Sequence, residues 1–265
     1  MEAEMQGKAK GTQVIRRATQ ILSAIARRSP AGVGLSEIAQ RTGLAQATAR
    51  RILRGLLEER LVTQNPTTHA YLLGPLVYEF GVCSTQQSGL IRHARPALER
   101  LAMQTGDTVY LIARSGAEAV CLDRVEGNFP VRVVTTGIGN RRPLGVGAVG
   151  LAILARLQES EIDAVLRTNA ADYSIYGLEL SDLRTAIRLS RERSYGFSDG
   201  LLTAGVSGIG LPILSPGGSP VAGISIASTS DRMSPARLAE LFGLLRSEIA
   251  GIHLNAGREH TAGQG

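Results

Sequence analysis

Apolar residues in the first quarter of the chain recur at spacings of three and four, which is the period of an α-helix. The pattern predicts a helix over residues 13–27 and a turn at "SPAGVG". A short helix, "EIAQRT", is expected next, with Ser36 as its N-cap and Gly43 at its C-terminal end. A longer helix, "AQATARRILRGLLEERL", follows. Two helices separated by a tight glycine turn have the spacing of a helix-turn-helix unit.

The longer helix has two chemically different faces. One face carries an apolar stripe that includes Ile52 and Leu53, whereas the opposite face carries Arg50, Arg51 and Arg54. A helix that packs through one stripe and exposes three arginines has the charge distribution of a major-groove recognition helix. An ordinary surface helix is the alternative, although such helices more often alternate acidic and basic residues.

Two short extended runs follow in "VTQNPTTHAYLLG", on either side of a turn signal at residues 65–68. A winged helix-turn-helix needs such a hairpin after its recognition helix. Thr67 and Thr68 at the tip are candidates for phosphate contacts, although exposed polar residues are also ordinary at a turn. The chain has six tyrosines, four phenylalanines and no tryptophan, so duplex DNA fits better as a partner than single-stranded bases.

The pattern changes to strands from Thr108 onward. "TVYLIAR", "EAVCLDRV" and "VRVVTT" are expected to be strands, and "VSGIGLPIL" and "PVAGISIAS" flank the hairpin signal "SPGGS". Helices are expected at about 147–157, 159–168 and 182–194, and a last one begins with Ser234 as its N-cap and Pro235 at its first position. Strands with interspersed helices indicate an α+β sheet domain, joined to the first module through a helical region near residues 75–88.

The stretch "PLGVGAVG" places glycines in the spacing G-x-G-x-x-G, the pattern of a dinucleotide-binding loop. Such a loop needs a buried strand directly before it and a second parallel strand ending in an acid about 20 residues later. Here a loop with Pro143 precedes Gly145, and Asp163 lies in a helical pattern. The sequence therefore argues against a dinucleotide cofactor, and no other cofactor is indicated.

The charge distribution divides the chain. Residues 1–75 carry 11 Lys/Arg against 5 Asp/Glu, which gives +6, whereas residues 76–265 carry 18 of each and are neutral. All the excess positive charge therefore belongs to the helix-turn-helix module, which favours a nucleic-acid partner over a merely soluble basic face.

Other composition features exclude several classes of protein. Cys83 and Cys121 lie in apolar neighbourhoods and are expected to be buried thiols, and the four histidines lack metal-ligand spacing, so no metal site is predicted. No run approaches the roughly 18 apolar residues of a membrane span, and neither end resembles an export signal. A cytoplasmic protein that does not enter membranes is the expectation.

These motifs resemble the IclR family of bacterial transcription regulators. The resemblance runs through "IRRATQILSAIA", "LSEIAQRTGLAQATARRILRGLLEERLV" and "YLLGPLVYEFG", and it continues into the second half of the chain. It implies a winged helix-turn-helix domain over 12–75, a linker helix over 76–88 and a mixed α/β, GAF-like effector-binding domain over 89–255. The ends, 1–11 and 256–265, are expected to be disordered.

The expected recognition helix departs from the family pattern at its start. Relatives commonly have a proline, a lysine and a serine where this chain has Ala45, Gln46 and Ala47, which leaves more of the DNA contact to later residues. The expected DNA-binding residues are Gln46, Thr48, Arg50, Arg51, Arg54, Thr67 and Thr68.

The resemblance also implies a pocket for an effector. In the family, the segment like "PLGVGA" forms one wall, with backbone amides facing a carboxylate-like ligand; the alternative is that its glycines only allow close helix packing. Asp199 matches an acidic residue at the pocket, although it could equally cap local backbone. The adjacent Arg141 and Arg142 could pair with a ligand carboxylate or with an acid on the surface, and the surface interpretation is preferred because it is the commoner one. The expected effector contacts are Gly147, Ala148, Asp199, Gly208, Ser225 and Ala227.

Two of these positions affect the choice of ligand. Some relatives carry a thiol or a hydroxyl where this chain has Gly208 and Ala227, so the pocket is expected to be roomier and less polar than theirs. An organic acid with a larger apolar or aromatic body is therefore expected, rather than an acid of two or three carbons.

The expected function is a ligand-responsive regulator that binds double-stranded operator DNA as a homodimer or as a dimer of dimers. The alternative is an enzyme acting on a small carboxylic acid with a basic N-terminal extension. No nucleophile lies beside a base, however, and "GVSGIG" lacks the G-x-S-x-G spacing, so no catalytic residue is predicted. A DNA-packaging protein would leave the neutral second half unexplained.

Overall fold

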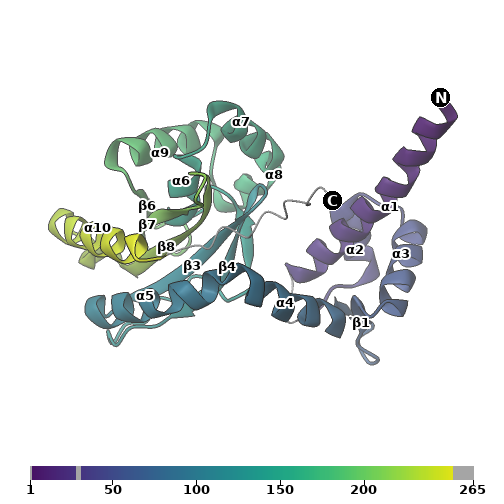
Figure 1. The fold of residues 1–265 in the computed structure, drawn as a ribbon, viewed down its shortest axis with the longest axis horizontal. Helices are drawn as coiled ribbons and strands as arrows, with labels where there is room; N and C mark the ends of the chain where they lie inside the picture. The colour runs from purple at the N-terminus through teal and green to yellow at the C-terminus, as the bar shows by residue number, and fades with distance from the viewer. Residues whose placement is uncertain (1, 28–30, 253–265) are drawn as a thin grey trace, which may run out of the picture. The chain divides into compact units, whose positions relative to one another are not determined.

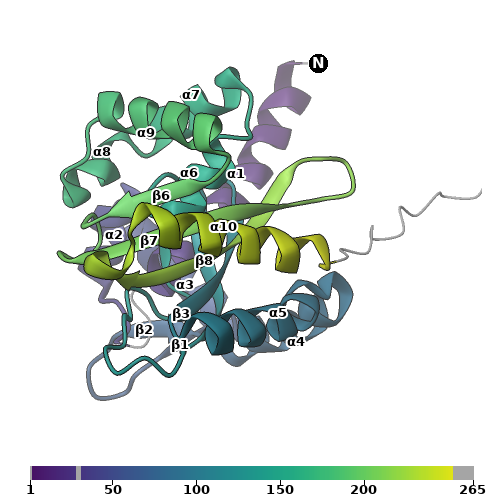
Figure 2. The same cartoon turned by 90° about the vertical axis from the view of Figure 1, so that its left-hand side faces the viewer.

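The computed structural model describes residues 2–27 and 31–252, and its chain divides into two compact units between Gln86 and Gln87 (Figures 1 and 2). The first unit contains a helix-turn-helix followed by a two-stranded hairpin. Its elements are α1 (Glu2–Ala26), α2 (Leu35–Thr42), α3 (Gln46–Glu58), β1 (Val62–Gln64), β2 (Tyr71–Leu73) and α4 (Pro75–Ser88).

The core of the first unit is built from the apolar stripes that the sequence pattern predicts. Ile21 and Ile25 of α1 are buried against Ile38 of α2 and Leu53 of α3. The hairpin closes this core because β1 and β2 pair antiparallel, and Val33 forms two backbone hydrogen bonds with Tyr71. The predicted winged helix-turn-helix is therefore confirmed.

The starts of α1 and α2 differ from the expectation. Residues 2–11, for which disorder was expected, are part of α1 in the structure. Ser36 is not the N-cap of α2, since the helix begins two residues earlier than expected, at Leu35, with Gly34 in the capping position. The Val33–Tyr71 bridge fixes the chain directly before this helix. The expected disorder of residues 256–265 lies outside the described residues.

The second unit is an α+β domain built on one six-stranded sheet, as predicted. The strand order is β5-β4-β3-β8-β7-β6, and every neighbouring pair is antiparallel. The elements are α5 (Leu90–Thr105), β3 (Thr108–Ser115), β4 (Glu118–Val125), β5 (Arg141–Pro143), α6 (Ala148–Leu154), α7 (Glu159–Thr168), α8 (Ala170–Tyr173), α9 (Leu180–Arg193), β6 (Gly196–Asp199), β7 (Val206–Leu214), β8 (Pro220–Thr229) and α10 (Pro235–Ala250), with short 3-10 turns at Ser174–Tyr176 and Ser230–Arg232.

The two faces of the sheet contact different elements, because successive residues of a strand point to opposite faces. Ile224 and Ile226 of β8 are fully buried in a core shared with α5 and α10, whereas Ser225 and Ala227 face the other side. Helices α6 to α9 cover that other side (Figure 1). As predicted, Ser234 caps α10, with its hydroxyl accepting a hydrogen bond from the Arg237 backbone N–H.

The segment 131–136 is not a strand, although its β-branched residues predict one. Val131 and Val134 are 56% and 52% exposed, whereas Val133 is buried. The segment docks through a side chain, because the Tyr110 hydroxyl donates to the Val133 carbonyl (2.9 Å) and accepts from the Thr135 N–H (3.0 Å). The free edge of β4 pairs with β5 only at its first three residues, Glu118 to Val120, and segment 131–136 does not join it.

The glycines of "PLGVGAVG" bring α6 into close contact with the chain around it. A Cβ atom at Gly150 would lie 2.6 Å from the backbone nitrogen of Gly145, and one at Gly196 would lie 2.0 Å from the carbonyl oxygen of Ala148. Gly147 has a φ of 91°, which favours glycine. The strand before this loop is a short antiparallel edge strand, so the loop is not the turn of a dinucleotide-binding fold.

The close contact between Gly196 and α6 leads to a prediction about stability. Gly196→Ala should lower the free energy of unfolding by about 1–3 kcal/mol, because the new methyl group forces the sheet away from α6. Gly243→Ala in α10 is the matched control, since nothing lies within 4 Å of its Cβ position and alanine favours a helix. Urea unfolding of both variants checks this, and equal stability of Gly196→Ala and the parent would contradict the packing argument.

Candidate DNA interface and ligand cavity

The exposed face of α3 and the hairpin form one concave surface. Arg50 and Arg54 lie one helical turn apart, and both line a groove that also includes Gln64 and Thr68 from the hairpin. The groove therefore joins two of the predicted recognition-helix residues to a predicted wing residue. Arg50 and Arg54 form no ion pair with a carboxylate in the described part of the chain, so their charges are available to an anionic partner.

The other expected DNA-binding residues are arranged less uniformly. Arg51 is also exposed, but it lines a different groove, between α3 and α1, together with Glu58 and Glu59. Gln46 is exposed at the first turn of α3 and its amide donates to the Ser36 hydroxyl at 3.3 Å, whereas Thr48 is half-buried.

The wing tip has the predicted turn. The Asn65 side chain accepts hydrogen bonds from the backbone N–H groups of Thr67 (2.9 Å) and Thr68 (3.0 Å). Both threonines are exposed, and the turn holds them in a fixed conformation beside the groove.

A cavity of about 70 Å³ lies in the second unit, between the sheet and the start of α6. Its lining is mostly apolar, with a few hydroxyls, which is typical of small-molecule sites, although its volume lies below the usual range of such sites. Five of the six residues predicted to contact an effector line it: Gly147, Ala148, Gly208, Ser225 and Ala227.

Asp199, the sixth expected residue, is not part of the lining. Its carboxylate accepts hydrogen bonds from the hydroxyls of Ser207 and Ser230, the latter at 2.8 Å. These two bonds, chiefly the one from Ser207, hold the pKa of Asp199 below its usual range. Asp199 thus ties the end of β6 to β7 and the turn after β8, and only its neighbours Ser198 and Ser207 reach the cavity.

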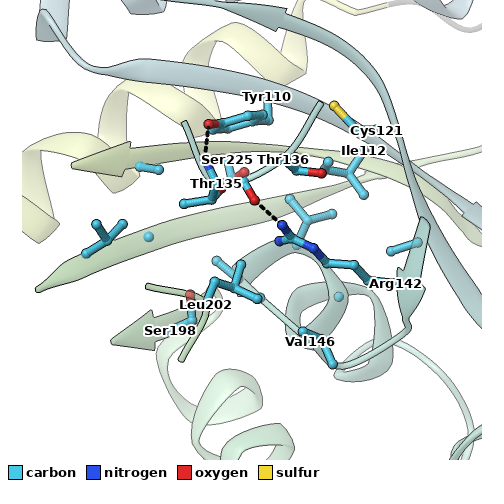
Figure 3. Close-up of a pocket in the computed structure, with 18 of the residues that line it drawn as sticks. Tyr110, Ile112, Cys121, Thr135, Thr136, Arg142, Val146, Ser198, Leu202 and Ser225 are labelled. Carbon is cyan, nitrogen blue, oxygen red and sulfur yellow. Dashed lines mark hydrogen bonds between the residues drawn. The ribbon is translucent and has the colours of Figure 1, made fainter. Parts of the chain in front are cut away.

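The interpretation of both arginines before the glycine loop as surface residues is wrong for Arg142. Neighbouring strand residues point in opposite directions, so Arg141 pairs with Glu118 (2.9 Å) and Ser115 (2.8 Å), whereas Arg142 enters the cavity. Figure 3 shows its guanidinium between Tyr110 on one side and Ser198 and Leu202 on the other. Two adjacent arginines in a strand point to opposite faces, but the sequence pattern predicted a loop before Gly145, so this difference between them was not expected.

Arg142 is a cation without a counter-ion. Its guanidinium donates to the carbonyl of Thr135, and no acidic residue is found among the described residues that line the cavity. Burial lowers the pKa of Arg142, because the cation loses water without gaining a carboxylate. An anionic group placed here would supply the missing charge.

Cys121 also lines the cavity, and burial raises the pKa of its thiol to about 11. The thiol therefore stays protonated at neutral pH, which makes it a poor nucleophile. The expectation that both cysteines are buried holds for Cys121 and is wrong for Cys83, which α4 leaves exposed beside Tyr78 and Phe80. The apolar neighbours of Cys83 are themselves exposed, so at this position an apolar stretch of sequence does not indicate burial.

In residues 2–27 and 31–252, no group of three or more metal-ligating side chains lies together. Over the same residues, no helix is long and apolar enough to cross a membrane.

Comparison with known families decides what the two units are. Residues 14–66 match the IclR helix-turn-helix domain, and residues 82–252 match the family described as bacterial transcriptional regulator IclR C-terminal. The chain belongs to the IclR family. Its two matched domains correspond to the helix-turn-helix unit and to the unit that contains the cavity, so this IclR protein is a DNA-binding transcriptional regulator and not an enzyme.

Characterised relatives agree with this assignment. The chain is 31% identical to the HTH-type transcriptional regulator BhcR of Paracoccus denitrificans over 234 residues, which cover 87% of this chain and 82% of BhcR. It is 32% identical to KipR of Bacillus subtilis over 210 residues, which cover 78% of this chain and 83% of KipR.

Solved structures of other IclR proteins share the fold. An IclR transcriptional regulator from a Silicibacter species has a TM-score of 0.79 at 22% identity, covering 90% of this chain and 94% of that one. An IclR homologue from Microbacterium hydrocarbonoxydans, solved in complex with 4-hydroxybenzoate, has a TM-score of 0.66 at 19% identity, covering 90% and 97%.

The different surroundings of the two cysteines predict different reactivity. Brief treatment of the native protein with iodoacetamide at neutral pH should modify Cys83 and leave Cys121 unmodified until the protein is unfolded, because Cys121 is both buried and protonated. Mass spectrometry of the peptides measures each site, with Cys83→Ser as the control that removes the fast reaction. Equal modification of both cysteines in the native protein would show that the cavity is open to the reagent.

Proposed function

We propose that a small organic acid bound in the cavity of the second unit modulates operator binding by this IclR-family regulator. The observation that carries the proposal is the Arg142 guanidinium, a cation that lines the cavity and has no carboxylate partner there. A charge-assisted hydrogen bond to an acid is stronger than a neutral one, so such a site favours carboxylates over uncharged molecules.

The remaining lining favours an acid with an apolar or aromatic body. Ile112, Val146 and Leu202 supply apolar surface, and Gly208 and Ala227 leave room without adding polar groups. The hydroxyls of Ser198 and Ser225 have no hydrogen bond within the described residues and are available to a polar substituent. The ligand 4-hydroxybenzoate, seen in the Microbacterium relative, has this combination of groups and is a suitable first probe.

The DNA-binding form that we propose is a homodimer on a two-fold symmetric operator. Each module presents one α3 helix and one wing, and Arg50, Arg54 and Thr68 share one groove between them. Two such modules match two half-sites, so a small ligand-dependent change in their spacing or orientation changes the affinity for DNA.

One prediction of the proposed function concerns the groove that contains Arg50 and Arg54. The double variant Arg50→Ala/Arg54→Ala should bind the duplex upstream of its own gene at least about tenfold more weakly, since two exposed cations are lost from one groove. Fluorescence anisotropy measures this. Arg184→Ala/Arg188→Ala on α9 removes the same charge from an exposed helix of the second unit and should leave the affinity unchanged. If both double variants lose affinity equally, the charge and not the groove determines binding.

The second prediction concerns the effector. Adding 4-hydroxybenzoate should change the affinity for the same duplex, whereas 4-hydroxybenzamide, which has the same shape and no charge, should have a much smaller effect. A panel that includes benzoate, hexanoate and acetate extends the comparison. No change in DNA affinity with any acid, or an equal change with each acid and its amide, would contradict the proposed function.

A further inference from the structure

The segment 131–138, called the strap from here on, covers part of the cavity without joining the sheet. Thr135 and Thr136 line the cavity, and Val133 is buried against it. The outer side of the strap is apolar and exposed, with Ile138 63% accessible. A segment with so few backbone ladder bonds depends on the side chains that hold it.

Two side chains hold the strap at Thr135, and they differ in charge; a third, Arg124, donates to the carbonyl of the neighbouring Thr136 at 3.2 Å. The Tyr110 hydroxyl donates to the Val133 carbonyl and accepts from the Thr135 N–H, so it holds the strap through neutral bonds. The Arg142 guanidinium donates to the Thr135 carbonyl from the other side. Dashed lines in Figure 3 mark the contacts of Thr135 with both residues.

The two anchors have different capacities for a ligand. Tyr110 already uses its hydroxyl proton and one lone pair on the strap. Arg142 has five N–H donors, and the bond to Thr135 is its one hydrogen bond to a described residue. Its remaining donors lie at the cavity wall, where no acidic side chain of the described residues compensates the charge.

We propose that Arg142 binds the acid group of the effector while it keeps the Thr135 carbonyl, so that occupancy of the cavity is transmitted to the strap. This inference rests on the proposed function and adds the residue that selects for an acid and the segment that responds to it. A carboxylate that accepts from the free edge of the guanidinium restrains its rotation, and the strap becomes more ordered as a result.

Variants of Tyr110 and Arg142 separate recognition of the ligand's charge from closure of the cavity by the strap. Calorimetry with 4-hydroxybenzoate and 4-hydroxybenzamide should show about a ten- to hundredfold loss of affinity for the acid in Arg142→Gln. The loss for the amide should be much smaller, because it reflects only the loosened strap. Tyr110→Phe should weaken the acid and the amide by the same factor, because it loosens the strap and leaves the cation in place. Arg141→Gln, the neighbouring surface variant, should bind both like the parent.

Two further variants keep the test decisive. Arg142→Lys retains the cation and should keep part of the preference for the acid over the amide. If Arg142→Gln fails to fold, as judged by circular dichroism, Arg142→Met supplies a neutral side chain of similar length.

Hydrogen exchange in the intact protein measures the strap itself. In the parent, 4-hydroxybenzoate should slow amide exchange over residues 131–138, and this protection should be absent in Arg142→Gln and retained in Arg141→Gln. Without ligand, Arg142→Gln should exchange faster than the parent in the same segment. Faster exchange of the parent's strap on binding the acid would mean that the acid displaces Thr135, which overturns the inference.

The outcomes distinguish this inference from the proposed function. If an acid of the panel binds and Arg142→Gln binds it as well as the parent, Arg142 is not the acid-binding residue, yet the cavity remains an effector site. If the acid binds without any change in the strap, the transmission to the strap is wrong. If no acid binds the parent at any concentration tested, the proposed function and the inference both fail.

Discussion

The close approach of α6 to the sheet is the constraint on which the second unit depends. Val149 of α6 sits against two glycines, since a Cβ at Gly210 would lie 2.9 Å from its backbone nitrogen and one at Gly223 would lie 2.7 Å from its side chain. With Gly196 touching Ala148, these positions let the helix lie directly on the strands. The first residues of α6 therefore form one wall of a cavity whose opposite wall is the sheet.

Arginines serve both units, and their solvation determines what each can bind. Arg50 and Arg54 are exposed and hydrated, which suits the many phosphates of DNA, where affinity comes from counter-ion release and falls with salt. Arg142 is partly desolvated in a small cavity, which suits one acid group of defined position. We therefore propose that the same side chain type supplies a broad electrostatic surface in one unit and a selective contact in the other.

The elements that the sequence predicts well are those whose pattern is set by local geometry. The apolar stripe of α3 follows from the helical period of its sequence. Strands β7 and β8 follow from the turn residues between them, and the Ser215–Ser219 turn closes that hairpin with a 2.8 Å backbone hydrogen bond. The strap is different: its β-branched residues resemble a strand, but Tyr110, more than twenty positions away, satisfies its backbone. For a related reason the sequence favoured the surface for Arg142, because the direction of its side chain depends on pairing with β4, and pairing is a tertiary property.

The central claim is that this chain reads a specific operator through the surface shared by α3 and the wing. Its most direct test is fluorescence anisotropy on the duplex upstream of its own gene and on a scrambled duplex, over a series of salt concentrations. We predict that binding to the scrambled duplex falls steeply with salt while binding to the natural duplex persists. Equal affinity for the two duplexes at every salt concentration would contradict the account.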